Sequence, residues 1–443
     1  MVSLLIPERK GEYLLSMKSS HNFLTNIKKF VNIFAKLPNK FDLCLFLTTI
    51  ALVVFGSLMI VSTKAGSSVG FIALFKVIVK QLVFVVASYI LMCFFANKFS
   101  MKKAKKYHLY IGIFIVILLA ITLGQTSVLG SRAWIRIPIP FFNITLQPAE
   151  FAKVFMIIVM AIYVESNVNR NTSVLKIIGV PLLFYIIFTI IIILQPDFGT
   201  LLILGFITLT CFFIPSHKKL RKLQRVFACL LPIGLCVLIY FCTPSGLATT
   251  EKIATKIPSI SHFSYRIEGA IDPFLHPKGS AGYQVINGLY GFAHGGLGGV
   301  GLGESVQKYG YLTQSDNDFI LSIVVEELGL FGLTVIIFGY FIIIFRLFLY
   351  AFKTKSEGYK IILVGTGLYI FYHFALNVAG VSGLLPLTGV PLLFISSGGS
   401  SLLSIMILIG ISQNVIARIR RQGSVSSRKK VIKKVGKAQT VSE

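Results

Sequence analysis

Ten long stretches of apolar residues run along the chain, separated by shorter polar or basic segments. Most are close to the roughly 20 residues that a helix needs to cross the hydrocarbon core of a bilayer. Buried helices of water-soluble proteins are usually shorter and carry a polar face. The pattern therefore predicts an all-α integral membrane protein with about ten transmembrane helices, at residues 43–63, 79–96, 107–124, 149–164, 176–195, 198–215, 226–242, 319–349, 359–380 and 391–416.

Composition and charge agree with this class and set an orientation. Of the 443 residues, 55% are hydrophobic and 13% are charged, about half the charged share of a typical soluble domain. A net charge of +27 would suggest a nucleic-acid partner in a soluble protein. Here, with the N-terminus placed inside, the segments on that side hold 32 of the 43 Lys and Arg residues. The positive-inside rule then predicts that both termini are cytoplasmic, and we expect no nucleic-acid partner.

The predicted spans divide the chain into three parts. Residues 1–41 form a basic cytoplasmic N-terminal segment, residues 42–416 the membrane domain, and residues 417–443 a basic cytoplasmic tail. The tail lacks an apolar core, so we expect it to be disordered. Within the membrane domain, one large extracytoplasmic loop at residues 243–318 is rich in Gly, Pro, Ser and aromatic residues. Loops of this length are usually functional or disordered, and this one is expected to be partly structured.

Ionisable residues inside apolar stretches are costly unless they are paired, so each is a candidate functional group. Glu150 and Lys153, three positions apart in QPAEFAK, share a helix face and can pair. The alternative to a functional role is a structural ion pair. Asp197, in LQPDFGT, can contact a substrate or can cap the following helix, because Asp is a favoured N-cap residue.

Two further polar regions lie near the C-terminal spans. Asp318 and Glu326 are eight positions apart and so near one helix face, where a buried acid pair favours a shared proton or a cation. A helix cap together with packing explains them equally well. Pro and Gly interrupt the last stretch in GLLPLTGVPLLFISSGGSS, which contains Ser396 and Ser400. Broken backbone at membrane depth lines a cavity or is buried in protein, so its hydroxyls can bind a headgroup, or its small residues can serve helix packing.

Motifs for several other chemistries are missing from the sequence. It contains no Walker A motif, GxSxG, HExxH or Cys/His metal cluster. The run GGLGGVGLG does not follow a soluble strand and so is not expected to bind a nucleotide. No nucleotide cofactor is expected.

Four sequence blocks occur in a fixed order along residues 42–416. They are GSRAWI with QPAEFAK; LQPDFGT; GYQV and GGLGGVGLGES with DFILSIVVEELG; and LLPLTGVPLLFISSGGSS. Together they resemble the SEDS family, whose branches are FtsW, RodA and SpoVE. The run GLGESVQKYGYL is more similar to the FtsW branch than to RodA.

The resemblance implies a ten-helix peptidoglycan glycosyltransferase that polymerises lipid II in cell-wall synthesis. Such a reaction needs a base for the acceptor hydroxyl and positive charge on the leaving lipid pyrophosphate. A divalent cation, Mg²⁺ or Mn²⁺, is the cofactor that the resemblance suggests for the second role, with Arg and Lys side chains as fixed charges. The expected substrate-binding residues are Arg132, Trp134, Glu150, Lys153, Asp197, Arg266, Asp318, Glu326, Ser396 and Ser400.

The expected catalytic position departs from the family pattern. SEDS proteins usually carry an acid shortly after an Asn/Asp-Pro pair in the long loop, and this acid is their best catalytic candidate. In IDPFLHPKGSAGYQV that register places His276 at the acid and Asp272 at the preceding Asn/Asp. His276 can act as a base, since imidazole titrates near about pH 6.5, but it is a poorer Mg²⁺ ligand than a carboxylate. Both Asp272 and His276 remain candidate catalytic residues.

Three functions stay open from the sequence. The first is a lipid II polymerase acting at the outer leaflet of the bacterial plasma membrane. The second is a lipid II flippase, because broken helices and intramembrane acids also suit transport. The third is a non-catalytic division scaffold, which the missing acid at position 276 favours. The expected protein partners are a class B penicillin-binding transpeptidase and other division proteins.

Overall fold

The computed structural model describes residues 36–65, 70–127, 131–139, 142–167, 173–241, 243, 245–249, 266–267, 269, 271, 273–275 and 281–439. Over these residues the chain forms a helical bundle with one two-stranded hairpin. The elements are α2 (Leu43–Ala65), α3 (Phe71–Lys98), α4 (Met101–Leu123), β1 (Ile135–Ile139), β2 (Phe142–Leu146), α5 (Pro148–Asn167), α6 (Val174–Leu194), α7 (Phe198–Phe213), α8 (Leu220–Phe241), the 3-10 turn η2 (Pro273–Leu275), α11 (Ala281–Gly295), α12 (Ile320–Lys353), α13 (Glu357–Val381) and α14 (Gly399–Gln439).

Each predicted apolar stretch coincides with a helix, so the all-α membrane fold is confirmed. Within the described residues, eight helices are long and apolar enough to cross a membrane. Of the other two, α7 has only 16 residues, and α5 carries Glu150, Lys153 and Glu165. The count of ten transmembrane helices therefore stays a prediction.

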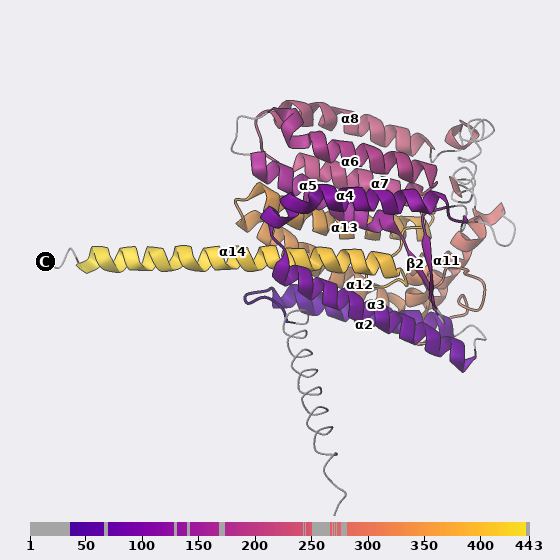
Figure 1. Cartoon of the computed structure of the whole chain (residues 1–443). Coiled ribbons are helices and arrows are strands. Elements are labelled where there is room, and N and C mark those ends of the chain that lie inside the picture. Colours follow the sequence, from indigo (N-terminus) through magenta and orange to yellow (C-terminus); the bar gives the residue numbers. More distant parts are fainter. Residues whose placement is uncertain are drawn as a thin grey trace, which may run out of the picture.

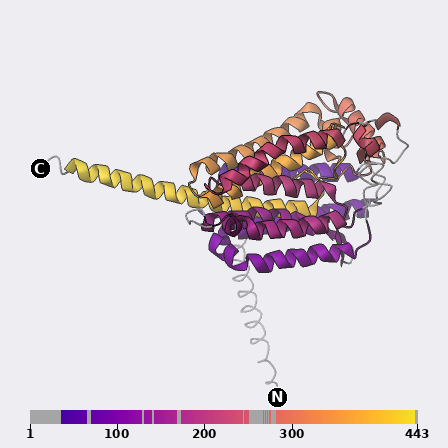
Figure 2. The same cartoon turned by 90° about the horizontal axis from the view of Figure 1, so that it is seen from above.

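Helices α5, α13 and α14 form the centre of the bundle, as Figure 1 and Figure 2 show. Helix α5 contacts α4, α6, α7, α13 and α14, and most of its side chains are buried. On the other side, α12 packs against α2 and α13, while α3 runs along α14. Gly410 allows this last contact, because a Cβ there would lie 2.3 Å from the carbonyl oxygen of Met92. Small residues permit such close backbone approach between membrane helices.

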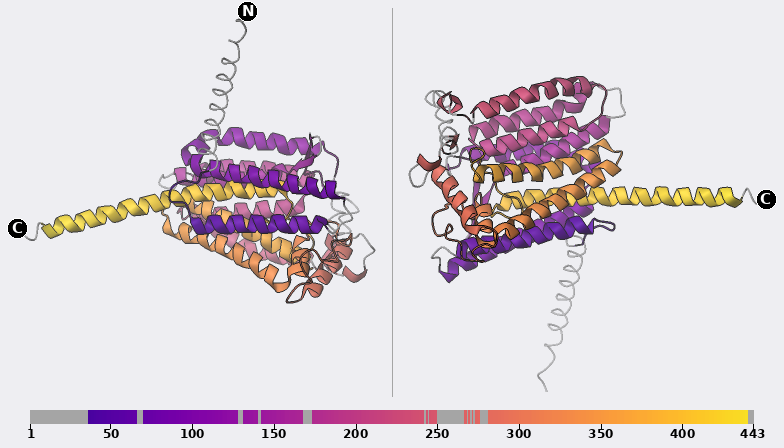
Figure 3. Two further views of the ribbon diagram at one scale, coloured as in Figure 1. Left: turned by 90° about the horizontal axis from the view of Figure 1, so that it is seen from below. Right: turned by 180° about the vertical axis from the view of Figure 1, so that it is seen from behind.

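The bundle has two ends, which Figure 3 shows from two sides. At the first end, here called the α14 end, helix α14 projects from the bundle. Asn414 Nδ2 of this helix donates a hydrogen bond of 2.6 Å to the carbonyl oxygen of Ala96 in α3. At the second, the hairpin end, lie α11 and the antiparallel hairpin, in which Ile135 faces Leu146. The candidate residues discussed below gather at the hairpin end.

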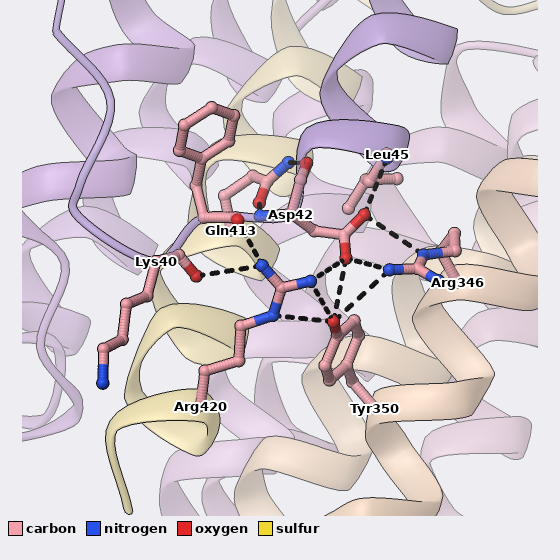
Figure 4. Close-up of polar contacts among 8 residues, drawn as sticks. Lys40, Asp42, Leu45, Arg346, Tyr350, Gln413 and Arg420 are labelled. Atoms are coloured by element: carbon pink, nitrogen blue, oxygen red, sulfur yellow. Dashed lines mark hydrogen bonds and ion pairs between the residues drawn. The ribbon is translucent and has the colours of Figure 1, made fainter. Parts of the chain in front are cut away.

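A network at the α14 end, here called the Asp42 clamp, joins three helices (Figure 4). Asp42 is fully buried just before α2, and its carboxylate accepts hydrogen bonds from Arg346 and Tyr350 of α12 and from Arg420 of α14. The bonds from Tyr350 and Arg420 measure 2.8 and 2.6 Å. Gln413 adds two bonds to the backbone of Asp42, at 2.8 and 3.0 Å. The buried charge is thus paired on every side.

Two sequence expectations are corrected by the fold. Helix α14 begins at Gly399, because residues 382–398 form an irregular segment instead of the start of the span. The same helix continues to Gln439, so the tail expected to be disordered is helical over residues 417–439. Of the outer loop at residues 243–318, the described part contains η2 and α11, in line with partial structure.

Candidate active site

Residues 382–398 interrupt the helices between α13 and α14, as their Pro and Gly residues predict. The backbone turns at Gly389 (φ 72°) and at Phe394 (φ 65°). A positive φ suits glycine but costs about 1–3 kcal/mol at a side chain such as Phe394. Phe394 is buried, and the hydroxyl of Tyr340 donates to the carbonyl oxygen of Leu393, so packing holds this conformation. Strained backbone of this kind clusters at ligand sites.

Asp318 and Arg266 meet beside this segment, so the structure brings together two of the predicted site residues. Arg266 Nη1 donates to the carbonyl oxygens of Leu387 (3.3 Å) and Thr388 (3.2 Å). Arg266 Nη1 and Asp318 Oδ2 each lie 3.7 Å from the point that a Cβ on Gly389 would occupy. Gly389 thus lies between the carboxyl group of Asp318 and the guanidinium of Arg266, and its positive φ favours glycine at this position.

Asp318 is influenced by its burial, by Arg266 and by two nearby carboxylates. Burial raises the pKa of Asp318, which precedes α12, to about 6; the charge of Arg266 opposes this shift. The nearby carboxylates of Asp316 and Asp197 raise the pKa of Asp318 further. Asp316 itself pairs with Lys64, with Oδ1 and Nζ 3.0 Å apart. A carboxyl group perturbed in this way is a marker of functional sites.

Several buried oxygens around the segment lack a hydrogen-bond partner within the described part of the chain. They include Asp318 Oδ1, Asn377 Oδ1 and Ser396 Oγ. Leaving one such group unpaired costs about 1–3 kcal/mol, so these atoms usually meet water or a ligand. We call this constellation the Asp318 site; it comprises Arg266, Asp318, Asn377, Ser396 and the segment 382–398.

Asp197 and Ser400 lie in a neighbouring chain of hydrogen bonds. Asp197 Oδ1 accepts from the backbone N of Thr200 at 3.1 Å, so the helix-cap interpretation is confirmed. Its Oδ2 accepts from Gln147 Nε2 at 2.8 Å, and Gln147 N donates to Ser400 Oγ at 2.9 Å. These bonds align the starts of α5, α7 and α14. Substrate contact by Asp197 or Ser400 stays a prediction.

Glu150 and Lys153 form the predicted ion pair in the centre of the bundle, with Oε1 and Nζ 2.8 Å apart. Lys153 Nζ also lies 3.1 Å from His373 Nε2, while His373 Nδ1 lies 3.2 Å from the carbonyl oxygen of Pro391. Because a carbonyl only accepts, we assign the imidazole proton to Nδ1, and Nε2 accepts from Lys153. Tyr369 donates to Glu150 Oε2 at 2.7 Å. The buried pair is thereby connected to the irregular segment.

Glu326 does not pair with Asp318, so that part of the sequence interpretation is wrong. The carboxylate of Glu326 accepts from the hydroxyl of Ser305 and from the backbone N of Val306 (3.0 Å) and Gln307 (3.3 Å). These bonds attach the preceding loop to α12, which is a packing role. Substrate contact by Glu326 stays a prediction.

The glycine-rich run packs its backbone onto a break in α12. Gly329, with φ 61°, interrupts the helix, and Gly301 N donates to the carbonyl oxygen of Glu327 at 3.0 Å. A Cβ on Gly299 would lie 2.3 Å from the same oxygen. These glycines therefore permit close contact between two backbones, which explains the run without a nucleotide.

The remaining predicted residues lie at or beyond the edge of what is described. Arg132 and Trp134 precede β1 at the hairpin end; the Arg132 side chain is exposed, and its backbone N donates to the carbonyl oxygen of Gln195 at 3.1 Å. Asp272 and His276 lie outside the described residues. Their catalytic roles stay predictions.

Sequence reasoning missed several groups that the structure places in these networks. His373 and Asn377 lie four residues apart in α13 and contact the irregular segment. Lys308 pairs with Glu327 in the interior, with Nζ and Oε1 3.0 Å apart. The available signal was the presence of polar side chains within or beside apolar stretches, where each one needs a partner.

A family model for cell cycle proteins of the FtsW, RodA and SpoVE type matches residues 42–421. The chain belongs to this family. FtsW of Bacillus subtilis (strain 168), a probable peptidoglycan glycosyltransferase, is 35% identical over 286 residues, or 65% of this chain and 67% of the relative. Stage V sporulation protein E of the same organism is 31% identical over 380 residues, or 84% of this chain and 96% of the relative.

Two solved structures have the same fold as this FtsW/RodA/SpoVE family member. A chain from a peptidoglycan synthase complex aligns with a TM-score of 0.62 and 19% identity, covering 86% of this chain and 99% of the other. RodA of Thermus thermophilus aligns with a TM-score of 0.54 and 18% identity, covering 86% and 97%. The predicted family, its FtsW-like character and the membrane fold are thus confirmed.

Proposed function

We propose that this family member is a peptidoglycan glycosyltransferase that polymerises lipid II into glycan strands during cell division. The observation that carries the proposal is the Asp318 site at the hairpin end. There, Arg266 and buried oxygens that have no partner in the described part of the chain lie beside strained backbone. The activity named for its FtsW relatives in Bacillus subtilis and Enterococcus hirae supports it.

The orientation in the membrane follows from the distribution of basic residues. The α14 end includes the α3–α4 connection, with five lysines in residues 97–106, and the arginines of the Asp42 clamp. By the positive-inside rule this end faces the cytoplasm, with both termini. We therefore propose that the Asp318 site lies toward the outer face of the bacterial plasma membrane, where a flipped lipid-linked sugar is available.

The proposed reaction exchanges one bond at a sugar carbon. The acceptor's 4-hydroxyl oxygen bonds to the donor's anomeric carbon, and the bond from that carbon to the pyrophosphate oxygen breaks. The hydroxyl proton passes to a base, for which Asp272 and His276 are the candidates. Arg266 supplies fixed positive charge for the departing lipid pyrophosphate, and the buried surroundings strengthen that interaction. The oxygens of Asp318, Asn377 and Ser396 can accept hydrogen bonds from sugar hydroxyls.

A divalent cation remains a separate proposal. Within the described ranges, no group of three or more His, Cys, Asp or Glu side chains is placed to hold a metal ion. Asp318, Asp316 and Asp197 offer the oxygen donors that Mg²⁺ prefers, but the three carboxylates do not converge. The described residues alone do not form such a site, so no step above uses a cation. Chelation followed by Mg²⁺ or Mn²⁺ addition tests it, with restored polymerisation as the expected result.

A class B penicillin-binding transpeptidase is the proposed partner, together with other division proteins. A peptidoglycan synthase complex that coordinates polymerization and crosslinking contains a chain of the same fold, which supports an assembly of this kind. Co-purification from detergent with the cognate transpeptidase tests it, and a transpeptidase of another division system serves as the control.

The deciding experiment uses purified full-length protein, fluorescent lipid II and the cognate transpeptidase. We expect glycan polymer, and we expect Asp272→Ala or His276→Ala to abolish it while the protein stays folded. Absence of polymer under every cation and partner condition would reject the enzyme and favour a scaffold that still binds the transpeptidase. Normal rates in both alanine variants would reject those two residues as the base.

The buried Glu150–Lys153–His373 network keeps a flippase as the second candidate, because charged groups inside a bundle also occur on transport paths. A liposome assay separates the two activities. A flippase transfers labelled lipid II between leaflets, which dithionite quenching detects, whereas a polymerase leaves its leaflet distribution unchanged. Transfer that Lys153→Met removes, without glycan polymer, would favour the flippase.

A further inference from the structure

A polar pocket lies at the α14 end, where the segment before α2, the last turn of α3 and helix α14 meet. Its volume is about 510 Å³. Ala96 of α3 and Asn414 and Ala417 of α14 line it and are buried, whereas Lys36 and Asn39 line it and are exposed. We call this space the Arg418 pocket, after the half-buried arginine of α14 that also lines it.

Hydrogen bonds hold the walls of the Arg418 pocket together. Asn97 Nδ2 of α3 donates to the carbonyl oxygen of Lys36 at 2.5 Å, which joins α3 to the segment before α2. Arg418 Nε donates to Asn414 Oδ1 at 2.8 Å, and Arg418 Nη2 donates to the carbonyl oxygen of Phe99 at 2.9 Å. The pocket is therefore formed before a ligand arrives, which reduces the cost of ordering it on binding.

The pocket is basic, and none of its described lining residues is acidic. Arg418 and Arg421 are three positions apart, so they share one face of α14. On the adjacent face, Arg420 is paired with Asp42 (Figure 4). Arg418 instead bonds to an amide oxygen and a carbonyl oxygen, which are both neutral. Within the part of the chain that the structure describes, neither Arg418 nor Lys36 pairs with a carboxylate.

We propose that the Arg418 pocket binds an acidic peptide segment of another cytoplasmic protein, with its carboxylates paired to Lys36, Arg418 and Arg421. Guanidinium groups form strong, often bidentate hydrogen bonds with carboxylates. The cations come from two separate parts of the chain, and the volume falls in the range of about 300–1,000 Å³ that suits a ligand larger than a single anion. The cytoplasmic location of the pocket rests on the orientation proposed above.

The lining favours a peptide over a phospholipid. A phospholipid needs apolar surface for its acyl chains beside the charges that hold its phosphate. The apolar residues that line the Arg418 pocket are Leu37, Pro38, Ala96 and Ala417. Two of these are alanines, so the pocket offers little surface for an acyl chain. The side chains of Asn39 and Asn97, which are exposed and line the pocket, carry amide groups that can bond to a peptide backbone.

Fluorescence anisotropy of a labelled peptide of alternating Asp and Glu residues, titrated with full-length protein in detergent, tests the proposal. The wild type should bind this peptide and should bind the same peptide with Asn and Gln far more weakly. The double variant Lys36→Gln/Arg418→Gln should bind it at least about tenfold more weakly, because two charge-assisted bonds are lost. Asn39→Trp should weaken binding similarly, because it fills the pocket and keeps all three cations. This exposed position should tolerate the change even if loss of Arg418 impairs folding.

The matched control changes two exposed lysines of α4 that lie outside the lining. Lys102→Gln/Lys106→Gln removes the same charge and should change peptide binding less than about twofold. Equal losses in the two double variants, or wild-type affinity in Asn39→Trp, would overturn the pocket as the binding site. If pyrophosphate or phosphatidylglycerol bound in an Arg418-dependent way and the peptide did not, the peptide would be rejected as the ligand. Because lipid II is absent from this titration, the result does not depend on polymerase activity.

Discussion

Two buried aspartates at opposite ends of the bundle show how the same residue can serve stability or binding. Asp42 precedes α2 at the α14 end, and Asp318 precedes α12 at the hairpin end. The carboxylate of Asp42 accepts bonds from two arginines, a tyrosine and a backbone N. The carboxylate of Asp318 has an oxygen without a partner among the residues that the structure describes, and nearby Arg266 is engaged with backbone carbonyls.

The pKa values of the two carboxyl groups are shifted in opposite directions, in keeping with this difference in partners. Burial raises the pKa of Asp42, but hydrogen bonds from Arg346, Leu45 and Tyr350 outweigh it and lower the value below the usual range. At Asp318 burial prevails and raises the pKa to about 6. A satisfied buried charge stabilises the fold, whereas an unsatisfied one is kept available for a ligand.

The largest expected effect is on activity at Asp318. Asp318→Asn keeps the size of the side chain but removes its charge, and we expect lipid II polymerisation to fall by about a hundredfold. The thermal midpoint should stay the same or rise, because a neutral amide is easier to bury than a carboxylate. A variant with wild-type polymerisation rates would show that Asp318 is not part of the active site.

At the other aspartate the expected effect is on stability. Asp42→Asn leaves Arg346 and Arg420 without their counter-charge and should lower the free energy of unfolding by roughly 2 kcal/mol. The loss stays below that of a fully buried pair because both arginines reach water. Polymerisation per folded molecule should be nearly unchanged. A thermal melt in detergent measures the first quantity, and a stable but inactive variant would contradict the assignment.

The dependence of stability on pH should separate the two groups. The raised pKa of Asp318 contributes stability that is complete below about pH 4 and is lost as pH rises through about 6, roughly 1 kcal/mol between pH 5 and pH 7. The lowered pKa of Asp42 contributes stability above its unfolded value of 3.8, which is lost on acidification below it. Melts across this range should show the step near pH 6 in wild type and Asp42→Asn, but not in Asp318→Asn.

The smallest expected effect concerns His373, which joins the buried ion pair to the irregular segment. The amide of His373→Asn lies near the Nδ1 position, so this variant keeps the bond to the carbonyl oxygen of Pro391 and loses the contact with Lys153. The amide of His373→Gln lies near the Nε2 position, so this variant keeps the contact with Lys153 and loses the bond to Pro391. Loss of one hydrogen bond costs about 1 kcal/mol, which corresponds to about a fivefold change in rate. We expect polymerisation to fall about fivefold more in the Gln variant. The reverse order would show that the contact with Lys153 matters more.

Much of the fold could be predicted from the sequence because each membrane-spanning helix needs a long apolar stretch. Each apolar stretch had to become a helix, and Asp197, next to a span, had to be satisfied, here by capping α7. The Glu150–Lys153 pair was predictable because its spacing is local. The irregular segment was predictable from its prolines and glycines.

Long-range partners could not be predicted in the same way. Arg420 and Asp42 are 378 positions apart, and nothing local selects that pairing over another. Likewise, the break at Gly329 becomes interpretable only once the glycine-rich run is seen packed against it. The tail is helical although its polar composition predicts disorder, because it continues a helix that the Asp42 clamp anchors. These outcomes depend on which helices become neighbours, which propensity alone does not determine.

Photocrosslinking with lipid II labelled in its sugar tests whether the substrate binds at the hairpin end. A benzoylphenylalanine probe replaces Leu384, which is 78% exposed near the Asp318 site, or Phe352, which is 83% exposed at the α14 end. We expect a labelled adduct from position 384 and none from position 352. Adducts at position 352 alone, from protein that still polymerises lipid II, would contradict a substrate site at the hairpin end.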